Sequence, residues 1–125
     1  MQWSGNPMKI LLIVAHGSRQ KAANKHLKRL VADLGTGMEG RFDKVACAFL
    51  QFNGPFVIDT LAELIAEGAT HIVIFPYFLS EGSHVTSDIP KLVQEAKQLH
   101  AGVTFEVAPM LGEMKGLKDL ILGVL

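Results

Sequence analysis

Four short runs of apolar residues alternate along the chain with segments whose apolar residues recur at helical spacing. The first run, Lys9 to Ala15, is continuously apolar after its lysine, and we predict further strands over Asp43–Leu50, His71–Pro76 and Val103–Val107. Strands that are apolar on both sides lie inside parallel sheets, with helices on both faces. A chain of 125 residues suits one domain. The predicted class is therefore α/β: a three-layer α/β/α domain with a four-stranded parallel sheet.

The first two connecting segments carry the period of amphipathic helices. A helix is predicted over Arg19–Leu34, with Ala23 in its apolar stripe. We expect Gly35 and Gly37 to end it. A second helix should begin with Pro55 in its first turn and be capped by Gly68.

The second half of the chain repeats the pattern. A loop is expected over Tyr77–Thr86, followed by a helix that Ser87 or Asp88 caps and that holds Pro90 in its first turn. The inward face of that helix should run from Ile89 to Leu99. Apolar residues at 117, 120, 121 and 124 predict a final helix, which we expect to pack on the body of the domain or on a partner.

Composition excludes several classes of protein. Twelve basic and twelve acidic residues cancel, so the chain lacks the overall basic excess of a nucleic-acid binder, although a local basic patch stays open. The single cysteine, Cys47, permits neither an internal disulfide nor a thiolate metal cage and suits a buried thiol in the cytoplasm. The longest apolar run, Ile10–Ala15, is too short to cross a membrane. We treat residues 1–7 as an extension and 8–125 as the domain.

Two histidines follow the carboxyl ends of predicted strands. Ligands of open parallel sheets bind at that edge, so the topology predicts that His16 and His84 lie near each other. We expect the remaining three histidines at the surface. His26 should lie on a polar helix face, His71 at the opposite edge of the sheet, and His100 at a helix end. Each edge histidine taken alone could instead be a loop residue bonded to backbone.

A pair of imidazoles without thiolates or a carboxylate cluster makes a transient metal site rather than a permanent one, and imidazole suits iron, cobalt, nickel and zinc. Imidazole also exchanges protons near neutral pH. The chain contains no Walker A sequence, no GxGxxG after its first strand and no GxSxG elbow, which argues against nucleotide and serine-hydrolase chemistry.

At these residues the sequence resembles the small CbiX/SirB-type class II chelatases, the sirohydrochlorin cobaltochelatases and ferrochelatases. The matching segments, in chain order, are His16-Gly17-Ser18-Arg19, Ala48-Phe49-Leu50 with Pro55, Gly68-Ala69, Pro76-Tyr77-Phe78-Leu79 with Gly82 and His84, Asp88-Ile89-Pro90, Pro109 and Leu111-Gly112. The resemblance implies that His16 is a metal ligand and proton acceptor and that His84 is the second metal ligand. It implies substrate contacts from Phe78, Leu79, Ser80, Glu81, Gly82 and Ser83, to which we add Gln51 and Arg19.

The implied activity is that of a lyase that inserts Co²⁺, Fe²⁺ or Ni²⁺ into sirohydrochlorin, in cobalamin, siroheme or another porphyrin pathway. The metal is then a substrate, and no organic cofactor, nucleic acid or membrane is expected. The resemblance also implies a homodimer, because a small member provides one wall of a cleft. Arg19, Lys21 and Lys91 are candidates to pair with the carboxylates of the tetrapyrrole.

The sequence departs from the resemblance at Gln51 and Gly54, where acidic residues are common, and an amide accepts no proton at neutral pH. Two alternatives therefore stay open. One is a non-catalytic protein that binds metal or tetrapyrrole on the same fold. The other is a half-domain whose partner chain supplies the missing carboxylate.

Overall fold

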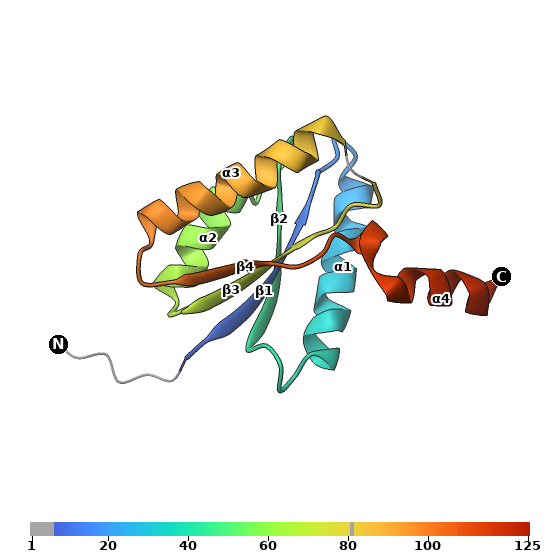
Figure 1. Cartoon of the computed structure of the whole chain (residues 1–125), viewed down its shortest axis with the longest axis horizontal. Coiled ribbons are helices and arrows are strands. Elements are labelled where there is room, and N and C mark those ends of the chain that lie inside the picture. Colours follow the sequence, from blue (N-terminus) through green and yellow to red (C-terminus); the bar gives the residue numbers. More distant parts are fainter. Residues whose placement is uncertain (1–6, 81) are drawn as a thin grey trace.

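The computed structural model describes residues 7–80 and 82–125, and in the third helix the side chains from Asp88 onward. Strands and helices alternate along the whole chain (Figure 1). In order, the elements are β1 (Lys9–Ala15), α1 (Lys21–Gly37), β2 (Lys44–Phe49), α2 (Val57–Ala66), β3 (His71–Pro76), α3 (Ser83–Leu99), β4 (Thr104–Val107), a short 3₁₀ turn η1 (Leu111–Glu113) and α4 (Lys115–Val124).

The strands form one parallel sheet in the order β2-β1-β3-β4. β1 lies in the middle, with Leu12 opposite both Ala46 of β2 and Ile74 of β3. Helix α1 covers one face, and α2 and α3 cover the other (Figure 1). The predicted α/β class, with its four-stranded parallel sheet between helical layers, is confirmed.

The core divides into two layers, one on each face of the sheet. Ile10, Leu12 and Val14 face α2 and α3, whereas Leu11 and Ile13 face α1. This division explains why β1 is apolar at consecutive positions, since successive side chains of a strand point to opposite faces. All but one of the residues in β1 are buried.

Helix α1 differs from its prediction at both ends. It spans Lys21–Gly37 instead of Arg19–Leu34, so both glycines expected to end it lie in its last turn, and Met38 caps it. Ala23, assigned to the apolar stripe, is exposed, and Asn24 is buried in its place. Strands β2 and β4 are also shorter than predicted, β2 by one residue at each end and β4 by one residue at its start.

Helix α2 starts two residues later than predicted. The Pro55 carbonyl accepts a 2.8 Å hydrogen bond from the Phe49 N–H, and Phe49 and Phe56 form a parallel bridge. These contacts keep residues 55 and 56 extended beside β2, so the helix begins at Val57. The predicted cap at Gly68 is confirmed, because this residue has φ of +113° and donates its N–H to the Ile65 carbonyl.

Helix α3 begins earlier than predicted, which is the main correction to the fold. It starts at Ser83, so Pro90 lies inside the helix instead of in its first turn, and the expected loop to Thr86 is too long. Pro90 is on the exposed side, where the loss of one helical hydrogen bond costs least. Leu99, expected to face inward, is exposed.

The C-terminal helix α4 projects from the domain, at the red end of the chain in Figure 1. None of its residues is buried. Leu117 is partly buried, and four other large apolar side chains of the helix are exposed: Leu120, Ile121, Leu122 and Val124, with Leu125 beyond the helix. Within the described residues this helix does not pack on the sheet. Of the helices that the structure describes, none has the length and apolar character needed to cross a membrane.

Candidate metal and tetrapyrrole site

The segments that follow β1, β2 and β3 meet at the carboxyl edge of the sheet. The N–H of Tyr77 donates to the Val14 carbonyl at 2.8 Å, and the N–H of Leu50 donates to the Ala15 carbonyl at 3.0 Å. The N–H of Gln51 then donates to the His16 carbonyl, also at 3.0 Å. The sheet pattern thus continues past the ends of the strands and holds the backbone around His16.

Gly17 allows the first two of these segments to cross closely. Its φ is +94°, a conformation that L side chains rarely adopt. A Cβ at this position would also collide with the Gln51 carbonyl oxygen. A glycine is therefore required directly after His16, which is a structural reason for this part of the sequence pattern.

The imidazole of His16 is exposed at this edge and lies against an aromatic ring. The ring centroids of His16 and Phe78 are 6.2 Å apart, with the planes at 81°. Phe78 is half-buried and packs on the core layer of α2 and α3, so it gives the imidazole an apolar support. The His16 side chain is therefore exposed to solvent and in contact with an apolar ring.

The segment after β4 contacts the backbone at Phe78. The N–H of Gly112, in η1, donates to the Phe78 carbonyl at 2.9 Å. A Cβ on Gly112 would overlap the Leu79 carbonyl oxygen, so the two segments touch backbone to backbone. The chain after β4 therefore helps to position the ring on which His16 rests.

Asn24 holds the turn after His16, a role that the sequence analysis missed. Its Oδ1 accepts a 3.2 Å hydrogen bond from the Ser18 N–H, and its Nδ2 donates to the Ser18 carbonyl at 3.1 Å. Asn24 is 8% exposed, on the face of α1 that packs against the sheet. A polar residue three positions before Leu27, in the apolar stripe of a helix, is the signal that would have identified it.

The segment after β2 contacts the same turn. Asn53 donates from Nδ2 to the Ser18 carbonyl at 3.3 Å, and the Arg19 guanidinium lies 5.1 Å from the centroid of the Phe52 ring. Phe52 has φ of +70° and is exposed. Arg19 and Gln51, both predicted to contact substrate, are exposed at this edge.

The third segment brings α3 to the same edge. Ser83 and His84 lie in the first turn of that helix instead of in a loop, with Gly82 as its N-cap. Leu79 and Ser80 are exposed before it. Glu81 lies outside the described residues, as do the side chains of Ser83 and His84. Among the described side chains, no three histidine, cysteine or acidic groups are close enough to hold a metal ion together.

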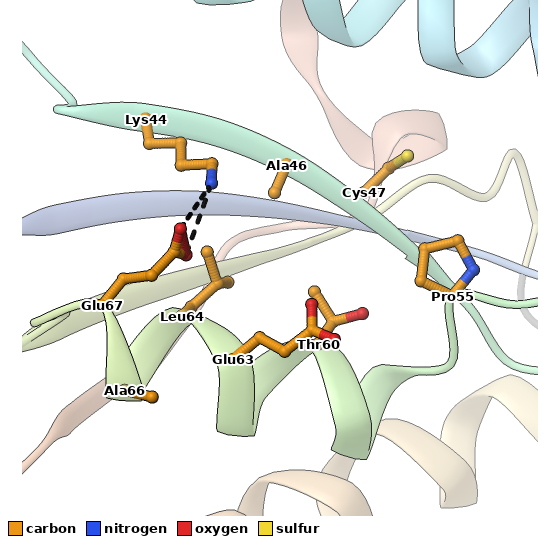
Figure 2. Close-up of a pocket in the computed structure, with 9 residues that line it drawn as sticks. All are labelled: Lys44, Ala46, Cys47, Pro55, Thr60, Glu63, Leu64, Ala66 and Glu67. Atoms are coloured by element: carbon orange, nitrogen blue, oxygen red, sulfur yellow. Dashed lines mark hydrogen bonds and ion pairs between the residues drawn. The ribbon is translucent and has the colours of Figure 1, made fainter.

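A hollow of about 510 Å³ lies away from His16, between β2 and α2 (Figure 2). An ion pair between Lys44 and Glu67, 3.3 Å long, borders it. The Cys47 sulfur points away from α2 toward the layer of α1 (Figure 2). Burial raises the pKa of this thiol, and the Lys28 ammonium partly opposes that effect. The sequence predicted a buried thiol, whereas the structure leaves Cys47 half-buried.

These features describe an open parallel α/β domain with an exposed histidine at the carboxyl edge of its sheet. The profile of the CbiX family matches residues 10–124, almost the whole chain. The chain therefore belongs to the CbiX family.

Curated relatives point to the same family. A sirohydrochlorin cobaltochelatase of Methanococcus maripaludis is 33% identical over 88 residues, which are 69% of this chain and 58% of that protein. The chloroplastic sirohydrochlorin ferrochelatase of Arabidopsis thaliana is 29% identical over 113 residues, 89% of this chain and 48% of that protein. The chain thus spans about half the length of these relatives.

Solved structures share the fold. A CbiX protein of Marinobacter aquaeolei VT8 superposes with a TM-score of 0.78 at 22% identity, over 93% of this chain and 92% of that one. The sirohydrochlorin chelatase SirB of Bacillus subtilis subspecies spizizenii, in complex with cobalt, gives 0.79 at 21% identity, over 93% of this chain and 49% of that one. At these identities the likeness establishes the fold.

Proposed function

We propose that this chain inserts a divalent metal, cobalt or iron, into sirohydrochlorin. The observation that carries the proposal is the exposed imidazole of His16, which lies against the Phe78 ring. Helix α3 begins at the same edge of the sheet, with His84 in its first turn. Membership of the CbiX family and the names of the curated relatives support the same reaction. Nickel is a third candidate metal.

The reaction replaces two pyrrole N–H protons with one M²⁺ ion and releases two protons. In our proposal His84 helps to hold the incoming metal, and His16 contributes a second imidazole and accepts a proton from the ring. Neutral imidazole performs both tasks. Phe78, beside His16, and the exposed Leu79 are proposed to contact an apolar face of the macrocycle. The segment 80–83 and Gln51 complete the proposed contacts.

We propose further that two copies form the working unit. One domain of this fold provides one wall of a cleft, and a macrocycle has two faces. The exposed apolar side of α4 is the surface that a second copy would cover. Light scattering at tens of micromolar should give the mass of a dimer, and Leu120→Lys should shift it toward a monomer. A wild-type monomer in the presence of sirohydrochlorin would contradict this arrangement.

The reaction is tested by anaerobic incubation with sirohydrochlorin and Co²⁺, Fe²⁺ or Ni²⁺ in turn, with the absorbance change followed over time. The proposal predicts many turnovers per chain, above the rate without protein, for cobalt or iron. Such an enzyme would act in the cytoplasm, in cobalamin or siroheme synthesis. An unaccelerated rate for every metal would refute the proposal.

A second candidate is a non-catalytic binding protein on the same fold. Gln51 favours it, because this exposed amide stands where a carboxylate is common in the family and does not accept a proton. Tight binding of metal or tetrapyrrole without turnover would select this alternative.

A further inference from the structure

A groove that the proposed reaction has not used runs along the start of α1. It has a volume of about 360 Å³, and its walls come from α1 and from the segment after β2: Lys21, Asn24, Lys25, Lys28, Asn53 and Gly54. The three lysines follow one another at helical spacing, so they share one face of α1. At about 1.5 Å per residue, their backbones extend over about 10 Å of the helix.

The charged residues that line this groove are all lysines. Residues 18–32 include five arginines and lysines and no acidic residue, although the whole chain has no net charge. Among the described residues the one ion pair within 4.0 Å is that of Lys44 with Glu67, so no described carboxylate lies within 4.0 Å of the ammonium groups of the groove lysines. Like charges at this spacing destabilise a helix. An anion bound in the groove would remove that repulsion.

The groove shares its wall with the proposed active site. Asn53 donates to the Ser18 carbonyl, and Asn24 bonds both the N–H and the carbonyl of Ser18. Ser18 lies two residues after His16 and Asn53 two residues after Gln51, whose N–H donates to the His16 carbonyl. An anionic ligand that extends from His16 across this turn would approach the groove that Lys21 lines.

We propose that the groove binds peripheral carboxylates of the tetrapyrrole whose ring lies over His16. This inference rests on the proposed function and names a subsite for its substrate. Sirohydrochlorin carries acetate and propionate arms around the rim of the ring, and these arms extend beyond whatever surface supports the macrocycle. Lysine ammonium groups on flexible stems suit such mobile, separate carboxylates better than a rigid bidentate site would. The groove orients the substrate by drawing the arms of one side toward α1.

The test uses a triple variant, Lys21→Gln, Lys25→Gln and Lys28→Gln. Equilibrium binding of metal-free sirohydrochlorin is followed by its own absorbance and fluorescence, and KM and kcat are measured with cobalt. Each exposed ion pair contributes little, so the loss of three should raise Kd and KM on the order of tenfold. Because the lysines do not touch the reacting nitrogens, kcat should stay within about twofold. The salt dependence of Kd should become weaker.

Two controls isolate the groove. The matched variant Lys9→Gln, Arg41→Gln and Lys97→Gln removes the same charge from exposed positions elsewhere and should leave Kd and KM unchanged. A porphyrin with only two carboxylates should bind wild type more weakly and lose little affinity in the groove variant. Circular dichroism confirms that both variants fold.

The outcomes separate this inference from the proposed function. If wild type binds sirohydrochlorin through the groove but inserts no metal, the proposed function fails and the groove stands. If wild type turns over and the groove variant keeps its Kd and KM, the groove proposal is wrong and the function stands. An equal loss of affinity in the matched control would also overturn the groove, because net charge alone would then explain the effect.

Discussion

Replacing Asn24 with alanine tests whether one buried amide holds the His16 turn. The side chain makes two hydrogen bonds to the backbone of Ser18, at 3.2 and 3.1 Å, and is 8% exposed. Asn24→Ala removes both bonds and leaves the rest of α1 unchanged. The turn after His16 then keeps three other supports: the bond from Asn53 to the Ser18 carbonyl, the bond from the Gln20 N–H to the Ser18 hydroxyl, and the bond from the Gln51 N–H to the His16 carbonyl.

The expected cost follows from these contacts. A typical hydrogen bond contributes about 0.5–1.5 kcal/mol net, so two contribute about 1–3 kcal/mol. Ser18 is half-buried, which lets water replace part of the loss, and alanine is the better helix former by about 0.5 kcal/mol. The variant should therefore be less stable by about 1–2 kcal/mol. For a domain of this size that lowers Tm by about 4–8 °C.

Urea unfolding followed by circular dichroism measures this change, and the turnover assay measures its effect on His16. We expect kcat to fall because the turn that carries the imidazole is loosened. His26→Ala, at an exposed position of the same helix, is the matched control and should resemble wild type in stability and rate. If Asn24→Ala stays within about 0.3 kcal/mol of wild type, the amide does not stabilise the turn and the reasoning fails.

Three shorter predictions address other residues. Gly112→Ala should be destabilised by several degrees in a thermal melt, because its Cβ would meet the Leu79 carbonyl; an unchanged Tm would show that the two segments separate freely. Gln51→Glu should raise turnover or metal affinity in the insertion assay, whereas unchanged rates would show that the amide is tolerated. Since burial raises the pKa of Cys47, iodoacetamide at pH 8 should alkylate the native thiol more slowly than the unfolded one, and Lys28→Gln should slow the reaction further; equal rates would contradict this.

The sheet was predictable because its signal is local. Consecutive apolar residues in β1 require burial on both faces, and the alternation with amphipathic segments then implies parallel strands. The position of His16 follows from that topology alone. Gly68 was predictable for the same reason, since a glycine directly after a helical pattern marks a cap.

The predicted helix starts were wrong where tertiary contacts override the local conformational preference of a residue. Proline is common in the first turn of helices, yet α3 extends seven residues before Pro90. Pro55 has the same preference, but its bond with Phe49 keeps it extended beside β2. The packing of α4 depends on what covers its apolar side, which sequence periodicity does not specify.

Some contacts of the candidate site could not be predicted from local sequence patterns. Contacts such as that of Arg19 with Phe52 join segments far apart in the chain, and only the folded backbone brings them together. The aromatic support of His16 by Phe78 belongs to the same class, because the two residues follow different strands.

In the proposed reaction, His16 and His84 act together in metal insertion. The most direct measurement is the rate of cobalt insertion into sirohydrochlorin by wild type, His16→Ala, His84→Ala and the double variant, each shown to be folded. If the two imidazoles share one metal during transfer, each single variant should lose most of the activity, and the double variant should be little slower than the slower single. A folded His84→Ala protein that inserts cobalt at the wild-type rate would contradict the claim.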